Sequence, residues 1–442
     1  MNAACVVLLS LALGYAALHD AGVEPNDWGV SLVAVGLCGI LCWSRARSPW
    51  PRGWTTWLPL TLLAWACFAL LPLPKALVRL LAPECAAALD GLTAIAGPWS
   101  WAALSAKPAA TLEKVIGLAG CILVFWLMAD LAGRLDDYPW AVAWPLLILA
   151  GFEAVLGLIQ AYAPGGDRIA TGTWVNRNHY CGFLELCLPF ALAYGVAVLG
   201  RGRSRHGVSL RMALAACGLF TIAALILLAI LHSFSRMGFV AALVSMFIMG
   251  AAALGSGEAP AWRRRLGPAL IGLLVLLAFI FLPPDKLIER FGHMAATEEI
   301  SADVRIQIWR DTLELVRAQP VAGSGLGAYE SALMRHKLAA PLYTVDFAHN
   351  DYLQLAAELG VFGLAVVVTL AALCLRSAWR AARRSHWEEE RWRALGALGG
   401  LSALALHSFV DFNLYIPANA MTLAWVAGIA IARSVSTGAA RA

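Results

Sequence analysis

Long apolar stretches alternate with short polar connections along the chain. Most stretches run for roughly 16 to 22 residues, and a helix of that length crosses a hydrocarbon core of about 30 Å. A soluble protein would not repeat such stretches so regularly. The pattern predicts an all-α polytopic membrane protein with twelve spans, near 2–19, 28–43, 56–72, 112–133, 140–162, 180–200, 211–231, 237–255, 267–282, 354–375, 394–411 and 418–433. No basic segment precedes the first span, so we expect a retained helix there and not a signal peptide.

Two connections are longer than simple turns, at 73–111 and 283–353. The first contains Trp99 and Trp101 beside Pro98, and indole rings settle at the membrane interface, so we expect an interfacial structure there. The second contains a predicted helix at about 302–318, with Ser301 or Asp303 as its cap and Pro320 as its stop.

Helical periodicity places Arg305 on the apolar side of this 302–318 helix. An arginine on a buried stripe needs a partner, although a first-turn arginine can also extend to water. The predicted apolar face consists of Ile306, Trp309, Leu313 and Val316.

Composition agrees with a membrane protein, because 60% of the 442 residues are apolar and only 14% are charged. The basic residues concentrate in one set of short connections, which includes 201–211 and 376–393, and this indicates that these connections and both termini are cytoplasmic. The loop 283–353 is then outside. This distribution accounts for the net charge of +5 without a nucleic-acid partner, and the ten cysteines lie mostly in spans, where they imply no disulfide framework.

Polar residues gather in the outer connection 168–179, which is denser in them than a turn requires. Its candidates for binding a polar substrate are Arg168, Asn176, Arg177 and Asn178. Alternatively, these side chains satisfy one another and nearby helix ends.

Arg236 begins a predicted helix after a tight outer connection. The planar guanidinium fits phosphate oxygens, and a helix N-terminus adds oriented N–H groups, so together they suit a diphosphate. Ser233, Ser235 and Gly238 flank it and suggest a backbone shaped for close approach; the alternative is an interfacial anchor.

His349 precedes the tenth span and is followed by Asn350 and Asp351. The helix dipole at that position keeps an imidazole neutral and able to accept a proton, which suits a general base. The alternative is an interfacial hydrogen-bonding group. Asp411, four residues after His407, would either orient a base or an arginine, or cap the last helix.

Glu153 and Glu185 fall inside predicted spans, where a carboxylate is either functional or a packing partner of an arginine. The sequence has neither a phosphate-binding P-loop nor a zinc motif with two histidines on one helix. Gly323, Gly325 and Gly327 have the wrong spacing for a dinucleotide fingerprint and predict a turn. We expect no metal and no cofactor.

His349-Asn350, followed after nine residues by Gly360-Val-Phe-Gly363, resembles the signature of bacterial O-antigen ligases, with Leu364 where those ligases have threonine. The segments at 172–178, 235–236, 305–309 and 323–329 also resemble family blocks in the expected order. The chain is therefore similar to the O-antigen ligase and polymerase superfamily over roughly 165–420.

The resemblance implies a GT-C-like membrane glycosyltransferase in the bacterial inner membrane. Such an enzyme transfers a glycan from undecaprenyl diphosphate to an acceptor sugar hydroxyl at the periplasmic face, with inversion and without a metal. The acceptor is a glycan, lipid A core or a protein, which leaves ligase, polymerase and protein glycosyltransferase open. Expected domains are transmembrane helices at 1–163, a catalytic membrane domain at 164–433 and a cytoplasmic tail at 434–442.

Within that mechanism the arginines neutralise the diphosphate and His349 takes the proton. The expected catalytic residues are His349, Arg236 and Arg305, and substrate would contact Arg168, Arg177, Asn176, Asn178, Asn350, Asp351 and Asp411. A flippase for lipid-linked glycans, or another transporter, is a second hypothesis, although such proteins often show internal symmetry. A membrane-bound O-acyltransferase is a third.

Overall fold

The computed structural model describes residues 2–44, 53–135, 138–164, 169–203, 207–254, 302–338 and 344–432. Helices occupy eleven of the twelve predicted spans, and the predicted span 267–282 lies outside the described residues. These helices are α1 (Asn2–Leu18), α2 (Pro25–Trp43), α3 (Trp54–Phe68), α7 (Pro108–Arg134), α8 (Trp144–Tyr162), α9 (Arg177–Arg203), α10 (Leu210–His232), α11 (Arg236–Leu254), α16 (Asp351–Arg384), α17 (Glu388–His407) and α18 (Pro417–Ile431).

Seven of the described helices are long and apolar enough to cross a membrane: α2, α7, α8, α9, α10, α11 and α16. The helices α1 and α18 are also apolar but shorter. The chain is thus a mostly helical, multi-pass membrane protein, and the total of twelve spans stays a prediction.

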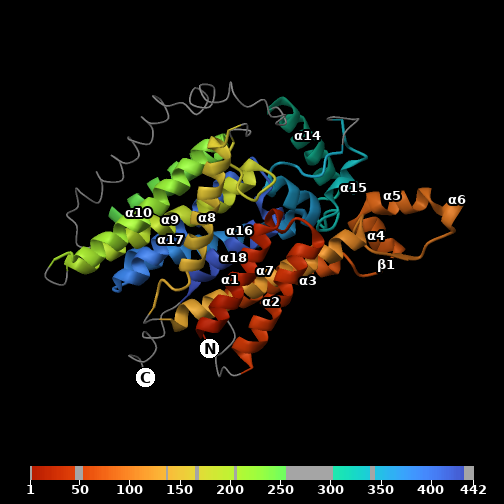
Figure 1. Cartoon of the computed structure of the whole chain (residues 1–442). Coiled ribbons are helices and arrows are strands. Elements are labelled where there is room, and N and C mark those ends of the chain that lie inside the picture. Colours follow the sequence, from red (N-terminus) through yellow and green to blue (C-terminus); the bar gives the residue numbers. More distant parts are fainter. Residues whose placement is uncertain are drawn as a thin grey trace.

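Helix α9 lies inside the bundle and packs against α8, α10, α11 and α17 (Figure 1). Its fully buried side chains include Tyr180, Phe183 and Phe190. Helix α17 can approach α9 closely because Gly400 has no Cβ. A Cβ there would lie 2.7 Å from the carbonyl oxygen of Leu186. This close packing brings α9 and α17, which are far apart in the sequence, into contact.

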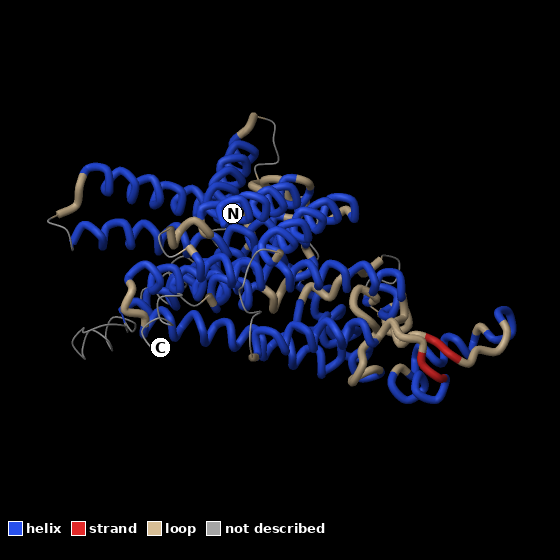
Figure 2. The backbone as a smooth tube through the Cα atoms, turned by 90° about the horizontal axis from the view of Figure 1, so that it is seen from below, coloured by secondary structure: helices blue, strands red, loops and turns tan. Residues whose placement is uncertain are grey.

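The predicted 73–111 connection forms a small unit that projects from one end of the bundle (Figure 2). It contains β1 (Leu73–Pro74), α4 (Lys75–Leu81), α5 (Pro83–Gly91), α6 (Thr93–Ala96) and β2 (Trp101–Ala102), with β1 and β2 antiparallel. Asp90 holds this unit together: it lies 2.7 Å from Lys75 Nζ and 2.8 Å from Arg79, and it accepts from the Trp99 indole. Its place at a membrane interface stays a prediction.

The predicted helix at 302–318 is confirmed as α14 (Ala302–Ala318), and α15 (Tyr329–Leu333) follows it. The predicted apolar face was wrong in part, because Ile306 and Leu313 are 45% and 40% exposed, whereas Trp309 and Val316 are half-buried. The buried face instead holds Ile308, Asp311, Thr312 and Leu315. Asp311 and Thr312 can be buried because later residues satisfy them: Asp311 accepts from Leu338 N, and Thr312 shares a hydrogen bond with the Tyr329 hydroxyl. The predicted caps lie outside the described side chains.

Helix α16 is interrupted at Gly360, which has φ of 66°. The segment 320–325 fills the interruption: Val361 N donates to Pro320 O at 2.8 Å, and Ser324 N donates to Ala357 O at 2.9 Å. A Cβ at Gly360 would lie 2.0 Å from Val321 O, so only glycine fits. The turn predicted around Gly323 and Gly325 is confirmed, and both have positive φ.

Candidate functional site

His349 lies between two anchored positions immediately before α16. The Trp309 indole of α14 donates to Ala348 O at 2.9 Å, and Ala348 N donates to Gln354 Oε1 at 2.8 Å. Asn350 is the N-cap of α16 and accepts from Leu353 N at 3.1 Å. His349 itself has φ of 49°, an uncommon conformation for a residue other than glycine that tends to occur at functional sites.

The side chain of Asp411 faces three histidines. Its Oδ1 lies 3.8 Å from His349 Nδ1 and 3.5 Å from His179 Nε2, and its Oδ2 lies 3.9 Å from His407 Nε2. The Asp411 side chain is 1% exposed and that of His349 is 15% exposed, so His349 is the more accessible member of this pair. The predicted role of Asp411 in orienting a base or an arginine stays a prediction.

Asp411 lies in the connection between α17 and α18, because α17 ends at His407 and not at 411 as predicted. Burial by itself would raise the pKa of Asp411, but His179, His349 and His407 hold that pKa well below its ordinary value. Asp411 is therefore a carboxylate at neutral pH. Its Oδ1 also accepts from Phe412 N at 2.9 Å, which fixes its direction.

Arg305 lies beside this cluster. Its Nη1 donates to Val410 O at 3.3 Å, and Val410 directly precedes Asp411. The sequence predicted a partner for Arg305, and this prediction is confirmed. The contact places a guanidinium of α14 next to the His349 and Asp411 pair, where it can meet an anionic substrate.

Two further arginines stand at the starts of neighbouring helices. Arg177 begins α9 and is half-buried, whereas Arg236 begins α11 and is exposed. The two helix starts are close together, because a Cβ at Gly238 would lie 2.7 Å from Cys181 Cβ and the Ser233 hydroxyl lies 2.9 Å from Cys181 Sγ. Ser235 also caps Gly238 N at 3.2 Å, so the sequence around Arg236 does shape a tight helix start.

Asn176 and Asn178 lie where the connection before α9 meets the helix. Asn176 Oδ1 accepts from Asn178 N at 2.8 Å, and Asn178 is buried beside His179. Arg168, the remaining predicted member of this group, lies outside the described residues. Substrate contacts of these residues stay predictions.

Asn350 and Asp351 have structural partners. Besides the cap formed by Asn350, the buried Asp351 accepts from Leu414 N at 3.2 Å, and its own N–H donates to Ser408 O at 2.9 Å. Asp351 therefore holds the start of α16 against the connection between α17 and α18. Direct substrate contact stays a prediction for both.

The sequence did not predict that His179, His407 and Glu185 lie together around Asp411. Glu185 Oε1 lies 3.0 Å from His407 Nδ1, and both side chains are fully buried. The spacing of four residues between His407 and Asp411 was the only available signal for their proximity. Glu153 has a different environment, since it accepts from Thr173 N at 2.9 Å.

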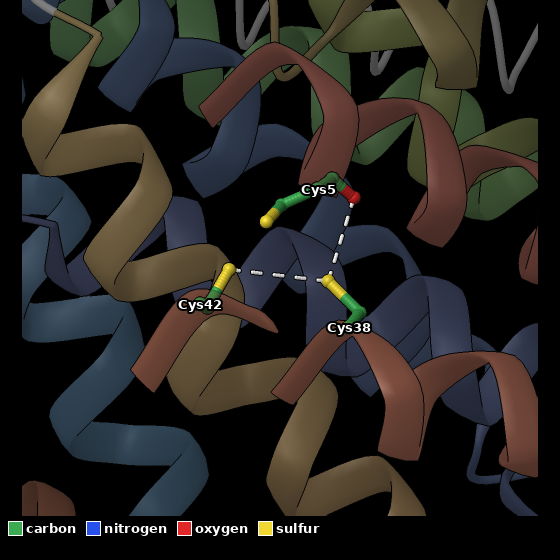
Figure 3. Close-up of side chains that lie close together, drawn as sticks. All are labelled: Cys5, Cys38 and Cys42. Atoms are coloured by element: carbon green, nitrogen blue, oxygen red, sulfur yellow. Dashed lines mark hydrogen bonds between the residues drawn. The ribbon is translucent and has the colours of Figure 1, made fainter. Parts of the chain in front are cut away.

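One group of described residues has the donor atoms for a metal: Cys5 of α1 with Cys38 and Cys42 of α2 (Figure 3). Their ligand atoms lie within 4.8 Å of one another, and Cys38 Sγ is 4.0 Å from Cys42 Sγ. All three are buried among apolar side chains of α1, α2 and α7, on elements that do not carry His349 or Asp411. They show no connection with the site.

A mostly apolar cavity of about 330 Å³ lies between α2, α3, α7, α16, α17 and α18. Its wall includes Tyr352, Ser408 and Leu414, which directly follow Asp351, His407 and Asn413 in the sequence. Glu113 and Lys114 add charged groups to the wall. The cavity wall therefore includes sequence neighbours of the cluster but none of its histidines, and the cavity offers space for an apolar chain.

Comparison with known proteins supports the resemblance found in the sequence. Residues 221–368 match the family model described as O-antigen ligase, a segment that contains Arg236, Arg305 and His349. No curated protein matches the chain. The match confirms the similarity to the O-antigen ligase and polymerase superfamily and supports glycan transfer or ligation as the general role.

Proposed function

We propose that the protein is a glycosyltransferase of the O-antigen ligase and polymerase type, which moves a glycan from undecaprenyl diphosphate to an acceptor sugar hydroxyl. The observation that carries this proposal is the placement of His349 against Asp411, with Arg305 bound to the carbonyl of the adjacent residue. A proton acceptor and a phosphate-binding group thereby meet at one place.

His349 is the general base in this proposal. Its Nδ1 faces the Asp411 carboxylate at 3.8 Å, so a hydrogen on Nδ1 is favoured there and Nε2 is the atom that takes the proton. As the acceptor oxygen attacks the anomeric carbon, its O–H bond breaks and the proton passes to Nε2. The bond from the anomeric carbon to the diphosphate breaks on the opposite face, which gives inversion.

The arginines stabilise the departing diphosphate. Arg305, Arg236 and Arg177 belong to three elements around the cluster, and Arg236 and Arg177 add the N–H groups of helix starts. Charge on the leaving group grows as the glycosyl bond breaks, so fixed cations stabilise the transition state more than the bound donor. No step requires a metal.

The apolar cavity beside the cluster takes the polyprenyl chain. Its wall is shared by α16, α17 and α18, the elements that carry or adjoin the candidate residues. A lipid chain held there would present its diphosphate at the cluster. In this proposal the site faces the periplasm of the inner membrane and both termini are cytoplasmic.

The test is turnover of a defined undecaprenyl-diphosphate oligosaccharide by the purified protein, with lipid A core, a second repeat unit and a protein offered separately as acceptors. Product analysis by gel and mass spectrometry should show one new glycosidic bond of inverted configuration, unaffected by a chelator. Transport of the intact donor across a vesicle membrane without any transfer would instead support the flippase hypothesis and overturn this proposal.

A further inference from the structure

Two buried titratable side chains lie behind Asp411 and have no part in the reaction described above. Glu185 of α9 and His407 of α17 are 0% and 1% exposed, and His407 Nδ1 lies 3.0 Å from Glu185 Oε1. The other ring nitrogen, Nε2, lies 3.9 Å from Asp411 Oδ2. A series of neighbouring groups therefore runs from Glu185 through His407 and Asp411 to His349, in which the first pair is hydrogen-bonded and the next two pairs are 3.9 Å and 3.8 Å apart.

Burying these titratable groups costs desolvation free energy. A carboxylate inside a protein needs a charge partner or hydrogen bonds, and three carboxyl groups are buried around His407: Glu185, Asp351 and Asp411. Among the described residues, four buried atoms that meet at Asp411 have no hydrogen-bond partner: His179 Nε2, His349 Nδ1, His407 Nε2 and Asp411 Oδ2. Buried polar atoms of this kind are rare, and each calls for an explanation.

The hydrogens of the series can be counted from the contacts. One hydrogen lies between Glu185 and His407 Nδ1, and His407 Nε2 must carry another to face the Asp411 carboxylate favourably. Glu185 and His407 together are then neutral, and Asp411 contributes one negative charge. When His349 takes a proton, the whole series becomes neutral.

Other charged or titratable groups adjoin the series from each neighbouring element. Helix α16 contributes Asp351, and α14 contributes Arg305 through Val410 O. From α9 come His179 and the Cys181 thiol, and α11 brings Gly238 so close that a Cβ there would lie 3.1 Å from Glu185 Oε1. These groups surround the series but do not replace the link between Glu185 and Asp411.

We propose that Glu185 and His407 form a relay that sets how strongly Asp411 attracts a proton to His349, and thereby the pH at which the reaction proceeds. This inference rests on the proposed function, in which His349 is the base. Glu185 and His407 are positioning residues, because they act through Asp411. Glu185 allows His407 to carry positive charge toward Asp411, which moderates the attraction of Asp411 for the proton on His349.

The test is the pH dependence of kcat in Glu185→Gln. Without the carboxylate, His407 stays uncharged and Asp411 holds the His349 proton more strongly. The acid limb of the profile should move to higher pH by about half a unit or more, with KM for the donor nearly unchanged. The matched control is Glu153→Gln, which removes a carboxylate that is also fully buried but contacts Thr173, and its profile should coincide with the parent profile.

His407→Gln is the second variant, for use if Glu185→Gln does not accumulate. It keeps an N–H donor but cannot become charged, so its profile should shift in the same direction. An unchanged acid limb in either variant overturns the relay. Turnover of His349→Ala within a few-fold of the parent would instead overturn the base assignment, so the two failures are distinguishable.

Discussion

The Trp309 indole donates to the carbonyl oxygen of Ala348 at 2.9 Å, and this bond ties α14 to the residue before His349. The helix that carries Arg305 and the segment that carries the proposed base are thereby held in one geometry. A change at Trp309 should affect catalysis although Trp309 need not touch substrate.

Trp309→Phe keeps the aromatic ring and removes the hydrogen bond, which is worth roughly 0.5 to 1.5 kcal/mol. We expect kcat to fall by about 3- to 10-fold, because His349 is less firmly placed. Trp126→Phe is the matched control, since it loses a comparable bond to Thr55 O at 2.8 Å on elements away from the cluster. Equal kcat in the two variants would show that the Trp309 bond has no special role.

His349→Ala should reduce transfer by about 10² to 10⁴, the usual cost of losing a positioned general base. Binding of the carrier lipid should persist, because the arginines remain. His232→Ala is the control. His232 is hydrogen-bonded to the Tyr162 hydroxyl at 2.8 Å and to Leu228 O, so its replacement should lower transfer only slightly. His179→Ala should fall between them, because His179 contacts Asp411. Turnover of His349→Ala within a few-fold of the parent would refute the assignment.

Arg236→Lys should lower activity at equal protein level, although charge is retained, because an ammonium group cannot form paired contacts with phosphate oxygens. Arg236→Ala should do at least as much harm. Arg380→Lys, at an exposed position in α16, should leave turnover unchanged and serves as the control. Near-normal product from Arg236→Lys would show that Arg236 only anchors the helix at the membrane surface.

Gly117→Leu should partly fill the apolar cavity, because Gly117 lines it and a Cβ there meets its first heavy atom, in Trp28, only at 4.0 Å. KM for a long-chain donor should rise by about tenfold, equivalent to roughly 1.4 kcal/mol, while a donor with two isoprene units should be less affected. Gly14→Leu in α1, where a Cβ would meet nothing within 4 Å, is the control and should change neither value. Equal effects on both donors would place the polyprenyl chain elsewhere.

Glu330→Cys in α15 should react with a membrane-impermeant thiol reagent in intact cells, whereas Arg380→Cys should react only after lysis. The reason is the distribution of arginines among the connections. The background should lack Cys67 and Cys217, the exposed cysteines among the described residues. Labelling of position 330 only after lysis would invert the predicted topology.

Much of the fold was accessible from the sequence, because long apolar stretches report directly on membrane helices. His349, Asp411 and Arg305 were found for the same local reasons, since each stands at a helix end or breaks an apolar pattern. The bond between Glu185 and His407 joins residues 222 positions apart, and no local pattern reports such a contact. The prediction of the buried face of α14 was wrong in part for a related reason: Asp311 and Thr312 form hydrogen bonds with residues of later segments.

The interruption of α16 at Gly360 has a mechanical consequence. The first part of the helix, at 351–359, accepts backbone hydrogen bonds from 324–325, so it is attached to the segment that joins α14 to α15. The second part begins at Val361, whose N–H donates to Pro320 O in the same segment. One segment, 320–325, therefore holds α16 on both sides of Gly360, so a movement of α14 and α15 would be transmitted to the start of α16, with His349 beside it, and to the first turn after Gly360 as well.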